Sequence, residues 1–241
     1  MKTNKFNKSS YKLLLGALLL VFAAFVFAKA LPTRVALASA PGYPTSADEM
    51  VTPYGSIGKW MLQANGQVST YGGQPYKGKT LVEVVNVVIV DPGSSSAAAS
   101  KTKVNSAMAR AGFPAQPIHS NGFKGLINNK TYGQLPGGIF NAYSDNSFLA
   151  QNNHGRLFGP AAVAGDGYIY SGAFSTEKPT IYNWLPAHAF VSSNVARDAL
   201  VRRLVASGQT QSVSIDMGNA YNTSDATTGD HDGKAAVIVL R

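Results

Sequence analysis

The segment that most constrains the fold is the apolar run at residues 81–90, LVEVVNVVIV. Its β-branched side chains favour an extended backbone, and its nearly continuous apolar character predicts a strand buried on both faces. The residues after it, Asp91-Pro92-Gly93, form a turn signal, and the serines at 94–96 offer a cap for a helix predicted over residues 97–111. A strand followed by a helix is half of a βαβ unit, so a sheet covered by helices is expected.

Further strands and one more helix are predicted downstream. Residues 113–144 are rich in proline and glycine and are expected to form a long irregular loop, and residues 177–186 a second loop. A helix is expected over residues 195–206, with Ser193 or Asn194 as its cap. Short strands are predicted at 156–158, 167–174, 187–191, 211–217 and 235–240. The expected fold class is α+β, a single sheet of about five to six strands covered mainly by two helices.

Residues 1–40 resemble an export segment. Four lysines without an acid precede a 16-residue apolar run at 13–28, and small residues near positions 28 and 40 offer cleavage sites. The run is shorter than the roughly 20 residues that span a bilayer, which favours a cleaved signal peptide, with an uncleaved anchor as the alternative. We therefore expect an exported chain, secreted, periplasmic or on the cell surface, that meets the membrane only through this segment.

The remainder divides into a linker and turn-rich extension at 41–80 and the α+β domain at 81–241. The formal charge of +9 is misleading, because six of the 21 basic residues lie before residue 41, which leaves 15 against 12 acidic residues, a net of +3. These basic residues are scattered, and a nucleic-acid partner is therefore not expected. The chain has no cysteine, which excludes disulfides and thiolate metal sites.

One segment matches the sequence pattern of a phosphate-binding motif but lacks the structural context that the motif needs. Residues 73–80, GQPYKGKT, match the P-loop pattern G-x-x-x-x-G-K-T. The motif works only between a strand and a helix, whereas here a strand is expected to follow, and Pro75 removes one loop amide. We predict a polar turn ahead of a strand and no nucleotide binding.

Polar residues concentrate at residues 152–160, NNHGRLFGP. Alternation along a strand places His154 and Arg156 on one face. They could form a structural pair that holds the long loop, which is the favoured interpretation. They could also form an anion site, in which Arg156 binds a carboxylate or phosphate and His154 donates a hydrogen bond or carries a proton. Asn153 and Phe158 belong to the same candidate surface.

The four histidines, at positions 119, 154, 188 and 231, show no local metal-ligand spacing. Three of them with a carboxylate could bind zinc if the fold assembled them, but separate hydrogen-bonding or surface roles are favoured. No metal, cofactor or catalytic residue is predicted. Arg197 and Asp198, at the start of the second helix, could cap that helix or orient His188.

Several motifs together resemble one family. The segment VNVVIV at 85–90, the helix after it and Ala111-Gly112-Phe113 match its opening strand, helix and alanine-glycine-aromatic segment. His154-Gly155-Arg156-Leu157-Phe158 resembles its histidine-x-arginine-x-aromatic motif, although tryptophan is common at the last position. The remaining matches are Gly172 to Ser175, His188 with the helix that carries Arg197 and Asp198, and Asp232-Gly233 before the last strand.

The chain thus resembles the LssY C-terminal domain family over residues 81–241. The family has no established activity, and the resemblance implies a bacterial envelope setting near lipid phosphates. The expected function is a non-catalytic binding or accessory role, with an anionic small molecule or lipid headgroup as partner. Its candidate binding residues are Asn153, His154, Arg156, Phe158, His188, Arg197, Asp198 and Asp232. The alternative is an envelope hydrolase of phosphate esters or lipids, with His154 or His188 as acid/base and Arg156 on the anion.

Overall fold

The computed structural model describes residues 43–163 and 167–241, so the predicted export segment lies outside the described residues. Strands make up 45% and helices 16% of the chain, which makes the fold mostly β. The expected α+β fold with one sheet of five to six strands is therefore wrong. One sheet has 13 strands and a second has three. None of the helices in the described ranges has the length and apolar character needed to cross a membrane.

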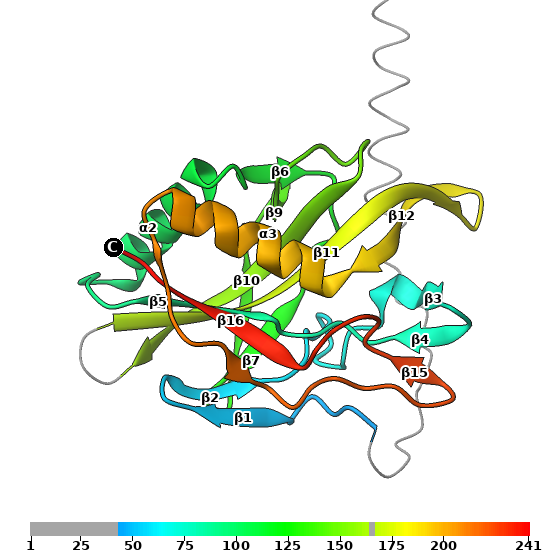
Figure 1. Ribbon diagram of the computed structural model, residues 1–241, viewed down its shortest axis with the longest axis horizontal. Helices are drawn as coiled ribbons and strands as arrows, with labels where there is room; N and C mark the ends of the chain where they lie inside the picture. Colours follow the sequence, from blue (N-terminus) through cyan, green and yellow to red (C-terminus); the bar gives the residue numbers. More distant parts are fainter. Residues whose placement is uncertain (1–42, 164–166) are drawn as a thin grey trace, which may run out of the picture. The chain divides into compact units, whose positions relative to one another are not determined.

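The large sheet follows the path β1-β2-β7-β8-β10-β11-β5-β16-β13, and β6, β9, β12 and β14 pair beside it (Figure 1). The small sheet has the order β15-β4-β3. The strands are β1 (Glu49–Thr52), β2 (Gly55–Gly58), β3 (Pro75–Tyr76), β4 (Lys79–Leu81), β5 (Val87–Asp91), β6 (Ala115–Pro117), β7 (Lys124–Ile127), β8 (Lys130–Leu135), β9 (Phe140–Ser144), β10 (Asn152–Val163), β11 (Gly167–Tyr182), β12 (Leu185–Ser192), β13 (Thr210–Gln211), β14 (Ile215–Asp216), β15 (Ala226–Thr227) and β16 (Lys234–Val239).

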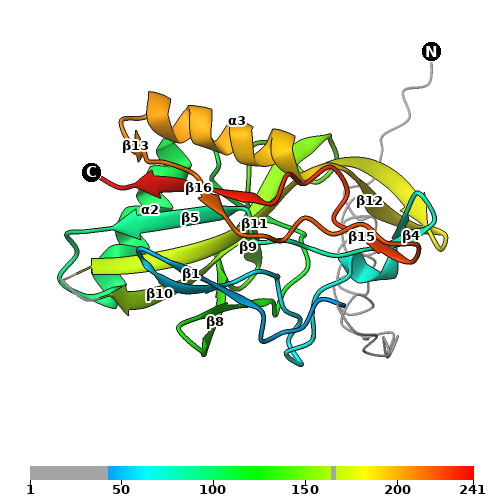
Figure 2. The same ribbon diagram turned by 60° about the horizontal axis from the view of Figure 1, so that its bottom comes forward.

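The central strand β5 is buried on both faces, as the sequence predicts. Val87 and Ile89 pack under two helices, α2 (Ala97–Arg110) and α3 (Ser193–Ala206), which cover the same face of the sheet. Figure 2 shows α3 lying along β16 on that face. Val88 packs on the opposite face against Ile57 of β2 and Ile127 of β7. The large sheet therefore curls so that its β2–β7 part covers the face that the helices leave open.

Both predicted helices form close to their expected positions. The Ser96 hydroxyl caps α2 by accepting a hydrogen bond from the Ala99 amide at 3.1 Å. The second helix begins two residues earlier than expected, because Ser192 rather than Ser193 or Asn194 is its cap and accepts from the Val195 amide at 2.9 Å. Each helix therefore begins at a serine that satisfies a free backbone donor.

Residues 113–144 form strands rather than the expected irregular loop. They contain β6, β7, β8 and β9, and a two-residue turn at Asn128 and Asn129 joins β7 to β8. Both asparagines have positive φ, 52° and 58°, as a type I′ hairpin turn requires. The proline and glycine content suggested a loop, but asparagine can take the left-handed conformation in place of glycine.

The middle strands are longer than expected. The hairpin of β10 and β11 replaces two short segments, and the loop expected at 177–186 is wrong because β11 runs to Tyr182 and β12 starts at Leu185. Pro179 made a strand unfavourable there, since proline lacks the amide that a ladder needs. The position is tolerated within the β11–β12 ladder, where Pro179 is paired with His188.

Two predicted strands are divided. The run at 81–90 contains the end of β4 and all but the last residue of β5, because its backbone changes partners: the Val82 amide donates to Thr227 of the small sheet, and the Val85 amide donates to Lys59. The strand expected at 211–217 is likewise split into β13 and β14, which pair with different parts of β16. The final strand, expected at 235–240, forms as β16.

Candidate functional site

Three titratable side chains meet where β10, β11 and β12 run side by side. The register pairs His154 with Ser175, so Glu177 lies two residues further along β11 on the same face. His154 Nε2 lies 3.3 Å from Glu177 Oε1, and His188 Nδ1 lies 3.3 Å from Glu177 Oε2. The exposed fractions are only 4%, 7% and 4% for His154, Glu177 and His188. The fold therefore holds two histidines against one carboxylate in the interior.

Hydrogen bonds determine which nitrogen of His154 carries the proton. Asn152 donates from Nδ2 to the carbonyls of Ser147 and Ala150, each at 3.1 Å, so its Oδ1 is left as an acceptor. His154 Nδ1 lies 2.7 Å from that Oδ1 and must donate to it. In a neutral His154, Nε2 therefore carries no proton, and its lone pair points to Glu177.

His188 is arranged in the same way with its nitrogens exchanged. Its Nε2 is hydrogen-bonded to the backbone carbonyl of Phe148, which can only accept, so Nε2 carries the proton. Its Nδ1 then faces Glu177. Two lone pairs and two carboxylate oxygens that face one another would repel, and a positive charge between them, such as a metal cation, would relieve that repulsion.

Glu177 is held as a carboxylate. Burial alone would raise its pKa, but the neighbouring His154 and His188 outweigh burial and lower the pKa to about 2. The Ser175 hydroxyl also donates to Glu177 Oε1 at 2.9 Å. A charged acceptor is thus available at the centre of the cluster at neutral pH.

Two aromatic rings from neighbouring loops cover the histidines. The ring of Phe148 stacks on His188 with centroids 4.2 Å apart, and the ring of His119 lies 4.5 Å from that of His154. Burial, together with the charges of His154 and Arg156, lowers the pKa of His119 to about 2, so His119 is neutral at pH 7. The sequence favoured separate histidines, whereas the structure brings three of the four together.

Arg156 lies beside this cluster, on the face of β10 that His154 shares. Its side chain is 6% exposed and donates to the carbonyl of Ser120 at 2.9 and 3.3 Å, and it lies 4.6 Å from the centre of the Phe123 ring. Burial lowers its pKa, an effect opposed by the nearby Glu83 and Glu177. The expected shared face for His154 and Arg156 is confirmed.

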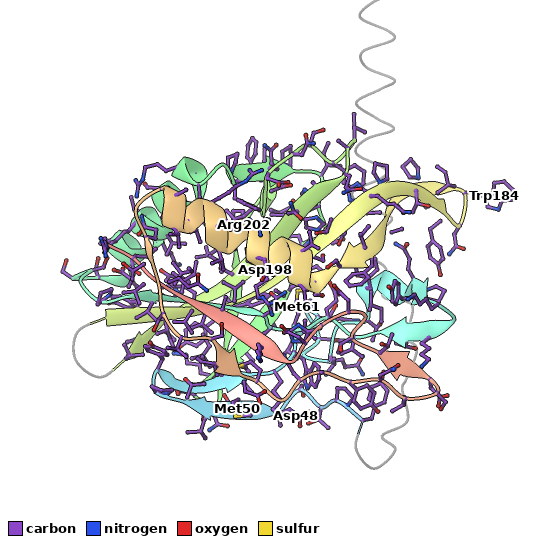
Figure 3. The ribbon with its side chains drawn as sticks, viewed as in Figure 1. Asp48, Met50, Met61, Trp184, Asp198 and Arg202 are labelled. Atoms are coloured by element: carbon purple, nitrogen blue, oxygen red, sulfur yellow. The ribbon has the colours of Figure 1, made fainter. Side chains whose placement is uncertain are left out.

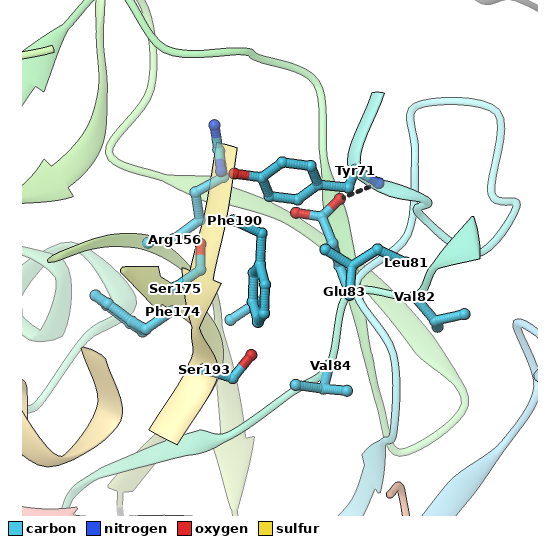
Figure 4. A pocket seen from close by; sticks show the side chains of 12 residues that line it. Tyr71, Leu81, Val82, Glu83, Val84, Arg156, Phe174, Ser175, Phe190 and Ser193 are labelled. Atoms are coloured by element: carbon cyan, nitrogen blue, oxygen red, sulfur yellow. Dashed lines mark hydrogen bonds between the residues drawn. The ribbon is translucent and has the colours of Figure 1, made fainter. Parts of the chain in front are cut away.

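A small cavity adjoins Arg156. It has a volume of about 20 Å³, and its lining includes Tyr71, Glu83, Arg156 and Ser175. The Tyr71 hydroxyl points toward the Arg156 side chain (Figure 4). A space of this size holds about one water molecule. An anionic ligand of the size expected from the sequence does not fit the cavity in this conformation.

Two further predicted residues have structural partners. Asn153 donates to Asp145 at 2.8 Å and accepts from the Thr176 hydroxyl at 2.6 Å, which fixes the start of β10. Phe158 is fully buried and packs with Met61 and Ala173. Asn153 therefore has a structural role at the start of β10, and Phe158 belongs to the core.

The other three predicted residues form a separate cluster. Arg197 on α3 binds Asp198 at 2.8 Å and both carboxylate oxygens of Asp232, at 2.6 and 3.1 Å. It also donates to the Lys234 carbonyl at 3.1 Å. The ion pairs and hydrogen bonds found in the described part of the chain do not connect this cluster to His188. The single candidate surface expected from the sequence is therefore divided in two.

Several members of the central cluster were missed from the sequence. Glu177 was placed in a loop, and Asn152, His119 and Phe148 were not assigned to the site. Extending the strand at 167–174 by four residues would have put Ser175 and Glu177 on one face, next to His154. Pro179 argued against a strand at these residues. Glu177 was therefore not placed on the same face as His154.

The P-loop-like segment is a hairpin. Residues 73–80 include β3 and the start of β4, and Lys77 and Gly78 form the turn with φ of 51° and 77°. The expected strand after the motif is confirmed, and Lys79 Nζ donates to Asn222 Oδ1 at 2.8 Å. We expect no ATP binding by calorimetry in the wild type or in Lys79→Ala. ATP binding that Lys79→Ala removes would contradict this prediction.

Comparisons with known proteins find no matching family model, curated protein or solved structure.

Proposed function

We propose that the protein is an exported metal-binding protein whose centre is formed by His154, Glu177 and His188. One ligating atom from each of the three side chains can be chosen so that all lie within 4.8 Å of one another. The observation that carries the proposal is that the inward nitrogens of both histidines face the same carboxylate. A divalent cation there would replace two protons and leave both histidines neutral.

The distances suit a transition metal. Zinc binds histidine nitrogen and carboxylate oxygen at about 2.0–2.2 Å, so neighbouring ligand atoms in a tetrahedral site are about 3.3 Å apart. His154 Nε2 lies 3.3 Å from Glu177 Oε1 and His188 Nδ1 lies 3.3 Å from Glu177 Oε2, so a carboxylate that binds through both oxygens would meet this spacing on each side. Two histidines and one carboxylate also serve Fe(II), which leaves zinc and iron to be distinguished by experiment.

The surroundings are those of a supported metal site. Ligating histidines usually donate their other nitrogen to a carbonyl or carboxylate, which fixes the tautomer. Asn152 and the Phe148 carbonyl do this for His154 and His188. A metal would tie β10, β11 and β12 together, which fits a binding or structural role.

Export and family resemblance remain parts of the proposal. The apolar run at 13–28 supports an envelope location. The resemblance to the LssY C-terminal domain rests partly on His154 and His188, which are two of the three proposed ligands. In a metal centre, both of those motif positions would be metal ligands.

The hydrolase alternative has less support. Its acid/base would be His154 or His188, but each is 4% exposed and each has its outward nitrogen bound to Asn152 or Phe148. Arg156 faces a cavity with room for about one water. His154, His188 and Arg156 are thus too little exposed in this conformation to contact a phosphate ester, so we favour metal binding without turnover.

The proposal is tested by the metal content of the full chain purified from cells grown with zinc and iron. We expect about one divalent metal per chain, loss of that metal in His188→Ala, and an affinity roughly 10- to 100-fold weaker in Asn152→Ala, which removes the support of His154. Elemental analysis identifies the metal, and calorimetry with the metal-free protein gives the affinity.

A matched control is available in the fourth histidine. His231 donates from Nε2 to Asn219 at 2.7 Å, away from the cluster, and a glutamine could make the same hydrogen bond. His231→Gln should retain full metal content. A wild type that binds neither zinc nor iron, or a His188→Ala variant that binds as well as the wild type, would refute the metal centre.

A further inference from the structure

The β11–β12 hairpin ends in an exposed apolar tip. Trp184 is 95% exposed, Ile181 65% and Leu185 44%. Tyr182 pairs with Leu185, so the turn consists of only Asn183 and Trp184. Figure 3 shows the Trp184 side chain projecting away from the rest of the fold. Three large apolar side chains at one tip are an unfavourable surface in water.

The backbone at this tip is also unfavourable for tryptophan. Asn183 and Trp184 have φ of 49° and 65°, the left-handed conformation that a type I′ turn requires and that glycine usually supplies at the second position. A bulky residue in this conformation is strained. Neither packing among the described residues nor backbone preference accounts for tryptophan here, which points to a contact beyond the described residues.

A second hairpin extends this surface and adds positive charge. The β3–β4 hairpin lies beside β11–β12, because the Tyr182 hydroxyl donates to the Gly73 carbonyl at 3.3 Å and the rings of Tyr76 and Phe190 are 5.0 Å apart. The two segments, 71–82 and 178–192, contain three lysines and no acidic residue. We name the surface formed by these two hairpins the hairpin tip.

We propose that the hairpin tip inserts into the interfacial region of an anionic lipid bilayer. Tryptophan prefers this region because its ring is apolar and its indole N–H can still meet water or headgroups. Lys77, Lys79 and Lys178 complement anionic headgroups. The apolar run at 13–28 is expected to direct the chain to a membrane, and only residues 29–42 separate that run from the described domain.

The test uses the full chain reconstituted in vesicles of phosphatidylcholine and phosphatidylglycerol, with and without a nitroxide quencher on the lipid chains. The protein has two tryptophans, so Trp60→Phe leaves Trp184 as the only one. We expect a blue shift of Trp184 emission in vesicles and at least an approximately twofold loss of that emission with the quencher, as for a side chain at the membrane interface.

The chain supplies its own control. Trp60 is 5% exposed, so Trp184→Ser, which leaves only Trp60, should show no quenching. The difference between the wild type and Trp184→Ser reports on Trp184 again without altering Trp60. Equal Trp184 emission with and without the quencher would overturn the proposal, as would emission unchanged from that in detergent-free buffer, the result expected of a tip that binds another protein.

Discussion

Replacing Gly155 by alanine is expected to lower the free energy of unfolding by about 3 kcal/mol, near the upper end of the usual cost of overpacking a core. A Cβ at this position would come well within 3.0 Å of the Ala173 carbonyl oxygen and the Phe174 ring. The carbonyl belongs to the paired strand β11, so it cannot move away without breaking the ladder. Urea denaturation measures the loss.

The same change should disrupt the candidate metal centre, because Gly155 lies between His154 and Arg156. Separation of β10 from β11 would move His154 away from Glu177, so metal affinity should fall together with stability. Gly133→Ala is the matched control: Gly133 also lies in a strand, and an added Cβ there would meet nothing within 4 Å. Equal stability of the two variants would show that β10 and β11 are less closely packed than described.

Replacing Glu177 by glutamine is expected to remove an acid-dependent part of the stability of the metal-free protein. The Glu177 pKa is lowered from 4.5 to about 2 in the folded state. A lowered carboxyl pKa stabilises the fold above the unfolded value of 4.5, and that stabilisation disappears as the pH falls toward 2. The contribution is about 3 kcal/mol for a shift of this size.

The measurement is the free energy of unfolding from pH 7 to pH 2 with a chelator present. The wild type should lose stability steeply below about pH 4.5, where unfolded glutamate takes up a proton. Glu177→Gln should lose about 3 kcal/mol less over that range. Glu49→Gln, on the half-buried strand β1, is the control and should follow the wild type. Identical acid profiles for the wild type and Glu177→Gln would mean that Glu177 is not held as a carboxylate between the histidines.

The predictable parts of the fold are those with strong local signals. The buried strand at β5 and the two helices follow from apolar runs, serine caps and terminal glycines, which act within a few residues. The β7–β8 hairpin was missed because its turn uses Asn128 and Asn129 rather than glycine. The size of the large sheet could not be predicted, because it depends on pairing between segments far apart in the sequence.

The candidate site was predicted only in part for a similar reason. Alternation along one strand placed His154 and Arg156 on a common face, which the structure confirms. Bringing His188 and Glu177 to them requires the register of β10, β11 and β12, and register depends on turn geometry and on which face is buried. The sequence therefore identified the histidine and the arginine but not the carboxylate at the centre.

The pairing of β5 with β16 has a consequence for how the protein is made. Ala236 aligns with Val87, a separation of 149 residues, and the two strands are parallel. Parallel contacts over such distances form slowly, since the entropy of closing a long loop is lost before the contacts that stabilise it can form. The core under α2 and α3 cannot close until β16 arrives. A newly synthesised chain would thus complete this core only after its last strand has been made.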